Sequence, residues 1–382
     1  TRAALLRLAH AYRKTLDTTR VIAVAGSNGK TTTVRLIQSI LSRRLRGVAS
    51  PKSFNNDIGV PLTLLSAKRG DQYIICEVGT NHPGEIAPLA AAIEPDIGVI
   101  TSIGREHLEG LGSIQGVVQE EMSLFHALRP GGLAVLCADS EPLMEYAKRL
   151  PLPQGATTVR FGVGEDADLR ITGAASTAQG VAFGLNGRGQ YRVSLPGLHN
   201  ASNAAAAIAV ARRMGIDQAD VEAGLAAASG PDMRMQRSVV AGVTFINDAY
   251  NANPESMLAS FAAFRGIAGA GADAAGRRVV VLGDMLELGD ASRAAHAEIG
   301  AALREARIAD LAIFTGGAML HAAMVYGVGA AYIAASDASE RYGLIAAQLR
   351  PGDTVLLAGS RGMALEGIIK AWQLRAESSA AS

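Results

Sequence analysis

A run of apolar residues ends in a glycine-rich turn whose residue types suit phosphate binding. Residues 21–25 predict a buried strand, and helix-compatible sequence follows the turn. We expect the backbone N–H groups from Gly26 to Gly29 and of the first helical turn to face phosphate oxygens, where the helix dipole adds positive charge. Lys30 would supply a full charge to the β- and γ-phosphates, and Thr31 a hydroxyl for Mg²⁺. The candidate nucleotide-binding residues here are Gly26, Ser27, Asn28, Gly29, Lys30, Thr31 and Thr32.

The spacing is that of the shorter G-x-x-G-K-T pattern. Val24 stands where the longer P-loop pattern has its first glycine. The alternative is a glycine-rich turn between a strand and a helix that binds nothing. Because Gly-Lys-Thr follows a clear strand, we favour the phosphate-binding interpretation.

Two further polar side chains stand near the ends of predicted strands. Residues 73–79 predict a buried strand with one carboxylate, Glu77, near its C-terminal end. A buried carboxylate is costly unless it is paired or holds a cation, and Mg²⁺ is the expected cation beside a phosphate-binding loop. His107 follows the apolar strand at 97–103. It is either a ligand near the same sheet edge or a structural histidine.

Composition narrows the class of protein. A chain of 382 residues that is 49% hydrophobic and 19% charged can bury sizeable cores in two or three domains. A net charge of +1 gives no sign of nucleic-acid binding. Cys76 and Cys137 lie in apolar runs without metal-ligand spacing, which is typical of a reducing compartment. With no membrane-spanning apolar stretch or signal peptide, we expect a cytoplasmic monomer that acts on small molecules without membrane insertion.

The pattern of strands and helices predicts an α/β protein of several segments. Residues 1–18 form a linker helix that leaves an upstream domain, and 19–232 form a P-loop domain with a mainly parallel sheet and a small antiparallel patch from about residue 158 to 195. Residues 233–376 form a second, Rossmann-like α/β domain. The boundary lies at Gly230-Pro231, which cannot continue a helix, and 377–382 are expected to be a disordered tail.

Polar residues follow several strands of the second domain. They occupy residues 247–254, 283–289 and 358–363. Because the carboxyl ends of parallel strands meet at one sheet edge, a ligand cleft explains these segments better than solvation does.

These motifs together resemble those of the Mur ligases, the ATP-dependent amino-acid and peptide-adding enzymes of bacterial cell-wall synthesis. The resemblance extends from the phosphate-binding turn through segments at 55–61, 107–110, 199–204, 248–254, 283–289 and 359–363. The last three point to the member that adds D-alanyl-D-alanine to UDP-N-acetylmuramoyl-tripeptide in peptidoglycan synthesis. The resemblance implies ATP and Mg²⁺ as cofactors. It also implies an acyl phosphate, formed by the tripeptide carboxylate and then attacked by the amine of the dipeptide.

The resemblance assigns metal ligation to Thr31, Glu77 and His107. Catalysis would be mostly positioning and charge neutralisation by Mg²⁺, Lys30 and Arg234. The candidate catalytic residues are therefore Lys30, His107 and Arg234.

The resemblance also implies nucleotide contacts outside the phosphate-binding turn. Asn200 would hydrogen-bond the adenine, although it could instead cap the alanine-rich helix that begins there. Arg234 would reach the γ-phosphate, Asp248 would bind the ribose, and Asn251 would be a further contact. Groups from both domains would thus bind one ATP.

The chain departs from the family pattern in three places. The N-terminal domain that holds the UDP end of the substrate has no counterpart, and residues 3–16 resemble only the helix that leaves it. Ala358 stands where the family has a lysine before Gly-Ser-Arg. Glu121 stands where a lysine, carbamylated in many members, is expected fourteen residues after His107.

Glu121 could supply the same negative oxygens as a carbamylated lysine. Residues 113–128 predict a helix, from which Glu121 could support a second Mg²⁺ near His107. The alternative places Glu121 with Glu120 on an exposed charged face, with the metal held by Glu77, Thr31 and His107 alone.

Two other functions remain open from sequence. A folylpolyglutamate synthetase-like ligase has a related two-domain core and a similar P-loop, but its C-terminal segments show no resemblance. A non-catalytic ATP-binding module would explain the loss of the first domain and of two lysines.

Overall fold

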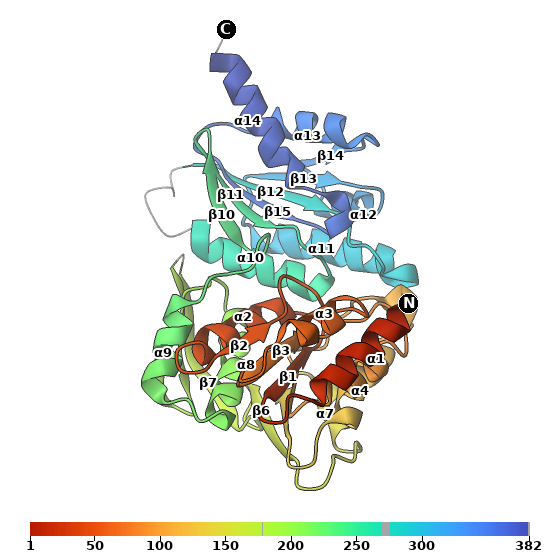
Figure 1. Cartoon of the computed structure of the whole chain (residues 1–382). Coiled ribbons are helices and arrows are strands. Elements are labelled where there is room, and N and C mark those ends of the chain that lie inside the picture. Colours follow the sequence, from red (N-terminus) through yellow and green to blue (C-terminus); the bar gives the residue numbers. More distant parts are fainter. Residues whose placement is uncertain (178, 269–275, 381–382) are drawn as a thin grey trace. The chain divides into compact units, whose positions relative to one another are not determined.

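The computed structural model describes residues 1–177, 179–268 and 276–380, which form two compact units (Figure 1). Unit 1 consists of residues 1–175 and 179–229, and unit 2 of residues 230 onward together with the short stretch at 176 and 177. Each unit has its own sheet, covered by helices. No helix in the described part of the chain is both long and apolar enough to span a lipid bilayer.

Unit 1 is built on a nine-stranded sheet in the order β2-β3-β1-β4-β5-β6-β7-β8-β9. Each strand from β2 across to β7 pairs in parallel with its neighbour. Strand β3 is buried along its whole length and β1 is buried after its first residue, as expected for parallel strands that are covered on both faces. The strands are β1 (Arg20–Ala25), β2 (Gly47–Ala49), β3 (Tyr73–Glu77), β4 (Ile97–Ile100), β5 (Leu133–Cys137), β6 (Thr157–Gly162), β7 (Leu169–Thr177), β8 (Gly180–Leu185) and β9 (Arg188–Val193).

The antiparallel patch is smaller than the sequence suggested. Strand β6 had been assigned to it, but β6 pairs in parallel with β5. Helix α7 (Glu141–Ala147) connects β5 to β6, and a helical crossover returns the chain in the parallel direction. Strands β8 and β9 do pair antiparallel, with an irregularity between Phe183 and Leu185.

The helices of unit 1 cover its sheet and share one large core. Helix α2 buries Val34, Ile37 and Leu41 and packs against α8 and α9. Its approach to α9 is so close that a Cβ at Gly224 would lie 2.6 Å from the Cα of Ile40. The remaining elements are α1 (Arg2–Arg13), α2 (Lys30–Leu41), α3 (Gly59–Ser66), α4 (Ile86–Ile93), α5 (Leu108–Leu111), α6 (Ile114–Met122), the 3₁₀ helix η1 (Ser123–Ala127), α8 (His199–Arg213) and α9 (Gln218–Ala227).

Unit 2 is an α/β unit with a six-stranded sheet in the order β10-β11-β15-β12-β13-β14. In the described part of the unit, β10 runs antiparallel to β11, and the pairings from β11 across to β14 are parallel. Alternate residues of β12 enter separate cores, Val280 with Phe314 and Val281 with Trp372. The strands are β10 (Gln236–Val240), β11 (Val243–Asp248), β12 (Arg278–Gly283), β13 (Leu311–Thr315), β14 (Ala330–Ile333) and β15 (Thr354–Ala358). The helices are α10 (Pro254–Ala268), η3 (Gly289–Ala291), α11 (Ser292–Ala306), α12 (Met319–Tyr326), α13 (Ala338–Ala346), η4 (Arg361–Met363) and α14 (Gly367–Ala380).

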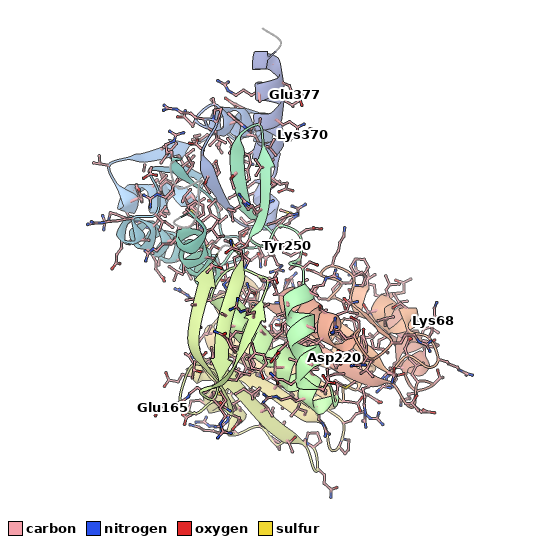
Figure 2. All side chains as sticks on the ribbon, turned by 90° about the vertical axis from the view of Figure 1, so that its left-hand side faces the viewer. Lys68, Glu165, Asp220, Tyr250, Lys370 and Glu377 are labelled. Carbon is pink, nitrogen blue, oxygen red and sulfur yellow. The ribbon has the colours of Figure 1, made fainter. Side chains whose placement is uncertain are left out.

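The end of the chain differs from the expected disordered tail. Helix α14 continues through Ala380, so residues 377–380 are helical. Glu377 lies in this helix, as does Lys370 (Figure 2). The local sequence is rich in alanine and serine, and the side chain of Ser378 donates a hydrogen bond to the Leu374 carbonyl one turn earlier. Residues 381 and 382 lie outside the described residues.

Helix α1 is tied to the core of unit 1 by a buried arginine. The Arg13 guanidinium donates hydrogen bonds to the carbonyls of Leu16 and of Ile93, the last residue of α4. It also lies 3.5 Å from the carboxylate of Asp96, and both side chains are less than a tenth exposed. The carbonyls at the C-terminal end of α4 thus find a charged donor.

We predict that Arg13→Ala lowers the free energy of unfolding of unit 1 by about 3 kcal/mol. The substitution removes the buried guanidinium from the α4 carbonyls and from Asp96, which keeps only the Val21 N–H and the more exposed Arg20 and Arg129 as partners. Urea unfolding followed by circular dichroism measures the change. Arg7→Ala, on the exposed side of the same helix, is the control and should cost less than about 0.5 kcal/mol. Equal effects from the two substitutions would contradict the anchoring role of Arg13.

Candidate functional site

The phosphate loop, residues 26–30, connects β1 to α2 in a conformation that only glycine adopts easily. Gly26 has φ +113° and Gly29 has φ +87°. A Cβ at Gly26 would lie 2.6 Å from Thr101 Oγ1, and one at Gly29 would lie 2.3 Å from Asn203 Oδ1. Both glycines are therefore required by backbone conformation and by close neighbours.

The first N–H groups of this loop donate to protein acceptors. Gly26 N–H donates to Glu121 Oε2 at 2.6 Å, Ser27 N–H to the Ser102 carbonyl at 2.9 Å, and Asn28 N–H to Ser102 Oγ at 3.0 Å. These three N–H groups, which the sequence assigns to phosphate, thus have acceptors within the protein. Buried donors need acceptors, and the ends of β4 and α6 supply them.

Lys30 folds back over the phosphate loop. Its ammonium donates to the carbonyls of Gly26 and Ser27 and lies 3.6 Å from Glu106 Oε1. Burial raises the pKa of Glu106, and the nearby Lys30 and His107 partly oppose that rise. Sequence reasoning missed Glu106, although its position directly before His107 was a usable signal. The ammonium that we expect to meet phosphate is thus already surrounded by oxygen acceptors.

His107 begins the short helix α5 in a left-handed conformation, with φ +51°. Its Nε2 lies 3.8 Å from Glu106 Oε2, and its side chain is 15% exposed. The structure therefore places His107 beside the carboxylate that faces Lys30.

The loop at residues 50–55 links Thr31 to Glu77. Thr31 Oγ1 lies 3.1 Å from Ser53 Oγ, and Asn55 donates from Nδ2 to Glu77 Oε1 at 3.0 Å. Ser50 Oγ accepts the backbone N–H of Glu77 at 2.9 Å. Glu77 ends β3, next to β1, and is only 1% exposed. This loop therefore orients the Glu77 carboxylate beside the phosphate loop.

The donor set suits a hard cation that is shared with a ligand. Over residues 1–177, 179–268 and 276–380, no three His, Cys, Asp or Glu side chains gather closely enough to hold a metal ion on their own. Mg²⁺ is commonly held by one or two carboxylates together with water and substrate phosphates. The hydroxyl of Thr31 and the carboxylate of Glu77 are donors of this kind.

Glu120 and Glu121 are both buried, so the alternative of an exposed charged face is wrong. Glu120 accepts the N–H groups of Gly84 and Ile86 at the start of α4. Glu121 is fully buried and accepts the Gly26 N–H through Oε2. Burial raises its pKa to about 8, and the nearby Lys30 opposes that rise. Glu120 thus binds the backbone at the start of α4, whereas Glu121 binds the backbone of the phosphate loop.

Asn200 does not cap its helix. Helix α8 has no side-chain cap; Asn200 donates to the Pro196 carbonyl and accepts from Asn203 Nδ2 at 3.0 Å. Asn203 Oδ1 accepts from Thr33 Oγ1 and lies against Gly29. Asn203 was missed from sequence, although its position three residues after Asn200 places both on one helix face.

The predicted residues of unit 2 lie near the C-terminal end of β11. Asp248 accepts the Met235 N–H through Oδ1 at 3.0 Å and a hydrogen bond from Ser260 Oγ through Oδ2. The Arg234 guanidinium lies 4.5 Å from the centre of the Tyr250 ring, a cation–π contact (Tyr250 is labelled in Figure 2). Asn251 follows in an exposed part of the same loop. Ala358, the family's lysine position, is buried in register with Asp248.

The loop after β12 is held by two side chains from other segments, Ser360 and His296, and by its own Asp284. Asp284 Oδ1 accepts the Met319 N–H at 2.8 Å, and Ser360 Oγ accepts the Leu286 N–H at 2.9 Å. His296 is fully buried; its Nε2 accepts the Met285 N–H, while Nδ1 lies 2.7 Å from the Ser292 carbonyl. These bonds require a neutral ring with its proton on Nδ1. The segment at 283–289 is thus a rigid platform at the sheet edge.

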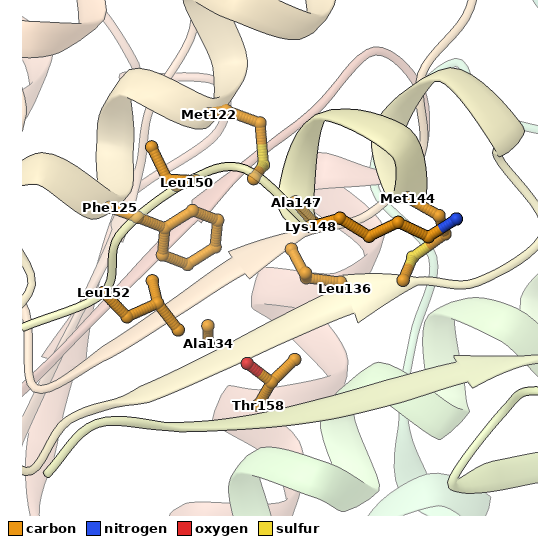
Figure 3. A pocket seen from close by; sticks show the side chains of 10 residues that line it. All are labelled: Met122, Phe125, Ala134, Leu136, Met144, Ala147, Lys148, Leu150, Leu152 and Thr158. Atoms are coloured by element: carbon orange, nitrogen blue, oxygen red, sulfur yellow. The ribbon is translucent and has the colours of Figure 1, made fainter.

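A separate cavity of about 180 Å³ lies in unit 1 (Figure 3). Its walls are mainly apolar, with Lys148 and Thr158 as the polar exceptions. It has no convergent polar groups of the kind that orient a substrate, so we assign it no part in the site. It is lined by Met122, Phe125, Ala134, Leu136, Met144, Ala147, Lys148, Leu150, Leu152 and Thr158.

The strand, phosphate loop and helix of unit 1 define a P-loop nucleotide-binding protein with a second α/β unit. The Mur ligase middle domain matches residues 24–211, and the Mur ligase glutamate ligase domain matches residues 233–361. The chain belongs to the Mur ligase family and is an ATP-dependent amide-bond-forming ligase.

Relatives of known name agree with this assignment. The chain is 34% identical to UDP-N-acetylmuramoyl-tripeptide–D-alanyl-D-alanine ligase of Bacillus subtilis, over 96% of the chain and 78% of the relative. It is 32% identical to the enzyme of that name from Escherichia coli, over 93% and 77%. The crystal structure of MurF from Acinetobacter baumannii superposes with a TM-score of 0.86 at 30% identity, covering 98% of this chain and 80% of the other.

We predict that unit 2 loses stability in mild acid through His296. Burial lowers the pKa of His296 from its ordinary value of 6.5, so the unfolded chain binds this proton more readily than the folded one. The free energy of unfolding should therefore be constant above about pH 7 and fall as the pH drops below 6.5. Urea unfolding followed by the fluorescence of Trp372, the single tryptophan, reports on this unit.

The control for this prediction is His296→Gln. This variant should be less stable by about 1 to 2 kcal/mol at pH 7.5, because the loop loses one or both ring hydrogen bonds. It should also lose most of the change in stability between pH 7 and 5.5. His126→Gln, at an exposed position, should keep that change. An unaltered pH dependence in His296→Gln would contradict the assignment.

Proposed function

We propose that the chain joins D-alanyl-D-alanine to UDP-N-acetylmuramoyl-tripeptide with ATP, in peptidoglycan synthesis. The observation that carries the proposal is the phosphate loop with Lys30 at the end of β1, within a chain that matches ligases of this name over nearly its whole length. The segments at 248–254, 283–289 and 359–363, all at strand ends of unit 2, support the same member of the family.

The phosphate loop would bind the β- and γ-phosphates of ATP. The tripeptide carboxylate attacks the γ-phosphorus, the bond to the β-phosphate oxygen breaks, and ADP leaves. The dipeptide amine then attacks the acyl carbon, inorganic phosphate leaves, and the amine loses its proton. Lys30 would hold the transferring phosphoryl group and offset its negative charge, so the chain acts mainly by positioning and charge neutralisation.

Thr31 and Glu77 would hold Mg²⁺ together with the nucleotide phosphates and water. When bound, the ion would neutralise charge on the phosphoryl oxygens. Asn55 and Ser50 orient Glu77 for this purpose through the bonds at its Oε1 and N–H. His107 is a further candidate ligand, next to Glu106.

The remaining nucleotide contacts are proposed by family resemblance. Asn200 would meet the adenine, and Arg234, Asp248 and Asn251 of unit 2 would meet the γ-phosphate and ribose. Arg234 is held over Tyr250, which fixes its direction, and Asp248 is held by two hydrogen bonds. We also expect the protein to act as a monomer.

The first test of this function is a substrate screen. With ATP and Mg²⁺, phosphate release should require both the UDP-muramoyl-tripeptide and D-alanyl-D-alanine, and mass spectrometry should find the pentapeptide product. Omission of either substrate is the internal control. Turnover of a folate with glutamate instead would favour the folylpolyglutamate synthetase alternative. ATP binding without turnover of any substrate would favour a non-catalytic module.

The second test concerns Lys30. Lys30→Ala should weaken ATP binding by at least about 2 kcal/mol, because a charge-assisted contact to phosphate is lost. Isothermal titration calorimetry measures the affinity. Lys68→Ala is the control, since Lys68 lies on the exposed surface of unit 1 (Figure 2). Undiminished affinity in Lys30→Ala would contradict the phosphate-binding role of the loop.

A further inference from the structure

Glu121 holds the first residue of the phosphate loop through its side chain. Its Oε2 accepts the Gly26 N–H at 2.6 Å, from helix α6, which is 95 residues distant in the chain. Its other oxygen, Oε1, is buried and has no hydrogen-bond partner within the described residues. The side chain has no exposed surface. Such a carboxylate is expensive to bury, so a role is expected for it.

The surroundings of Gly26 leave no room for a contact that would replace the hydrogen bond from its N–H to Glu121. Its carbonyl is occupied by the Lys30 ammonium, and its Cα faces Thr101 and Ser102 so closely that no Cβ would fit. Its N–H is buried, and loss of the acceptor would leave that donor unsatisfied. The position of Gly26 therefore depends on Glu121 on one side and on the end of β4 on the other.

We propose that Glu121 is a positioning residue of the ligase, which fixes the phosphate loop through the Gly26 N–H rather than by binding a second Mg²⁺. The part of this inference that concerns ATP rests on the proposed function. The part that concerns the contact to Gly26 does not. Glu121 uses one oxygen for Gly26, and no three His, Cys, Asp or Glu side chains in the described part of the chain gather closely enough to hold a metal ion. The charged groups near it are Lys30, Glu106 and Glu120, so a second cation there would compete with the Lys30 ammonium.

Two substitutions separate hydrogen bonding from metal binding. Glu121→Gln keeps an oxygen acceptor of nearly the same shape but removes the charge that a metal would need. Glu121→Met keeps the volume and removes the acceptor. Glu120→Met is the matched control, because the neighbouring carboxylate is also buried but accepts the N–H groups of Gly84 and Ile86.

Hydrogen–deuterium exchange tests the contact without any substrate. In Glu121→Met, exchange of the Gly26 amide should accelerate at least about tenfold, while Glu121→Gln should stay within about threefold of the parent protein. In Glu120→Met the acceleration should appear at Gly84 and Ile86 and not at Gly26. Thermal unfolding of each variant shows that it is folded. An unchanged Gly26 amide in Glu121→Met would overturn the proposal.

Kinetics test the consequence for the reaction. Glu121→Met should raise the KM for ATP about tenfold and leave the KM for D-alanyl-D-alanine within about twofold, and Glu121→Gln should restore the KM for ATP. The Mg²⁺ concentration that gives half-maximal rate should be the same in Glu121→Gln and the parent. A higher Mg²⁺ requirement in Glu121→Gln would overturn the proposal in favour of a metal ligand. If the parent lacks ligase activity, the proposed function fails while the exchange experiment still decides the role of Glu121.

Discussion

The structure of unit 1 depends on satisfying the polar groups of a turn that lies at the end of a buried strand. Strand β1 is flanked by parallel strands on both sides, and the phosphate loop that follows it exposes little surface at Gly26 and Ser27. Water cannot supply partners to buried N–H and C=O groups, so neighbouring elements must do so. The end of β4 supplies Ser102 and helix α6 supplies Glu121. The loop is therefore shaped before any ligand arrives.

In unit 2 as well, the backbone N–H groups of loops need hydrogen-bond acceptors from other segments. Its strand ends carry Asp248, Asp284 and Ser360, and each accepts a backbone N–H from another segment. The His296 ring adds an acceptor for Met285 from inside the core. These contacts restrain the loops at the sheet edge, where we propose that a substrate binds, and such restraint lowers the entropy cost of positioning it. Residues on these loops are therefore held in place much as residues of the strands that precede them are.

The elements of both units follow from local pattern, whereas the partners of the polar residues do not. Apolar β-branched runs predicted β1, β3 and β12, and Gly-Lys-Thr after a strand predicted the phosphate loop, because these signals lie within a few residues of each other. The Glu121 contact joins residues 95 positions apart. The residue pattern around either position does not indicate that the two residues are in contact. The sequence suggested one exposed face for Glu120 and Glu121, but each is buried against a different backbone segment.

The antiparallel patch and the C-terminal tail show the same limit on a larger scale. Strand β6 has the short, alternating composition of an antiparallel strand, yet the preceding helix α7 returns the chain parallel to β5. Residues 377–380 have the composition of a frayed end but continue α14. For β6, the connection that comes before the strand, and not the strand's own residues, determines its direction.

The affinity that Lys30 would contribute depends on the difference between its oxygen partners in the protein and its oxygen partners in a nucleotide phosphate. Its ammonium donates to the carbonyls of Gly26 and Ser27 and lies near the buried carboxylate of Glu106. A nucleotide phosphate must compete with these oxygens, so the net gain is far smaller than the direct attraction between an ammonium and a phosphate. The carbonyl partners belong to the same loop that holds the phosphate. A shift of Gly26 would therefore move the Lys30 ammonium both with and without a bound nucleotide. The contact from Glu121 to Gly26 thus influences the ammonium in both states.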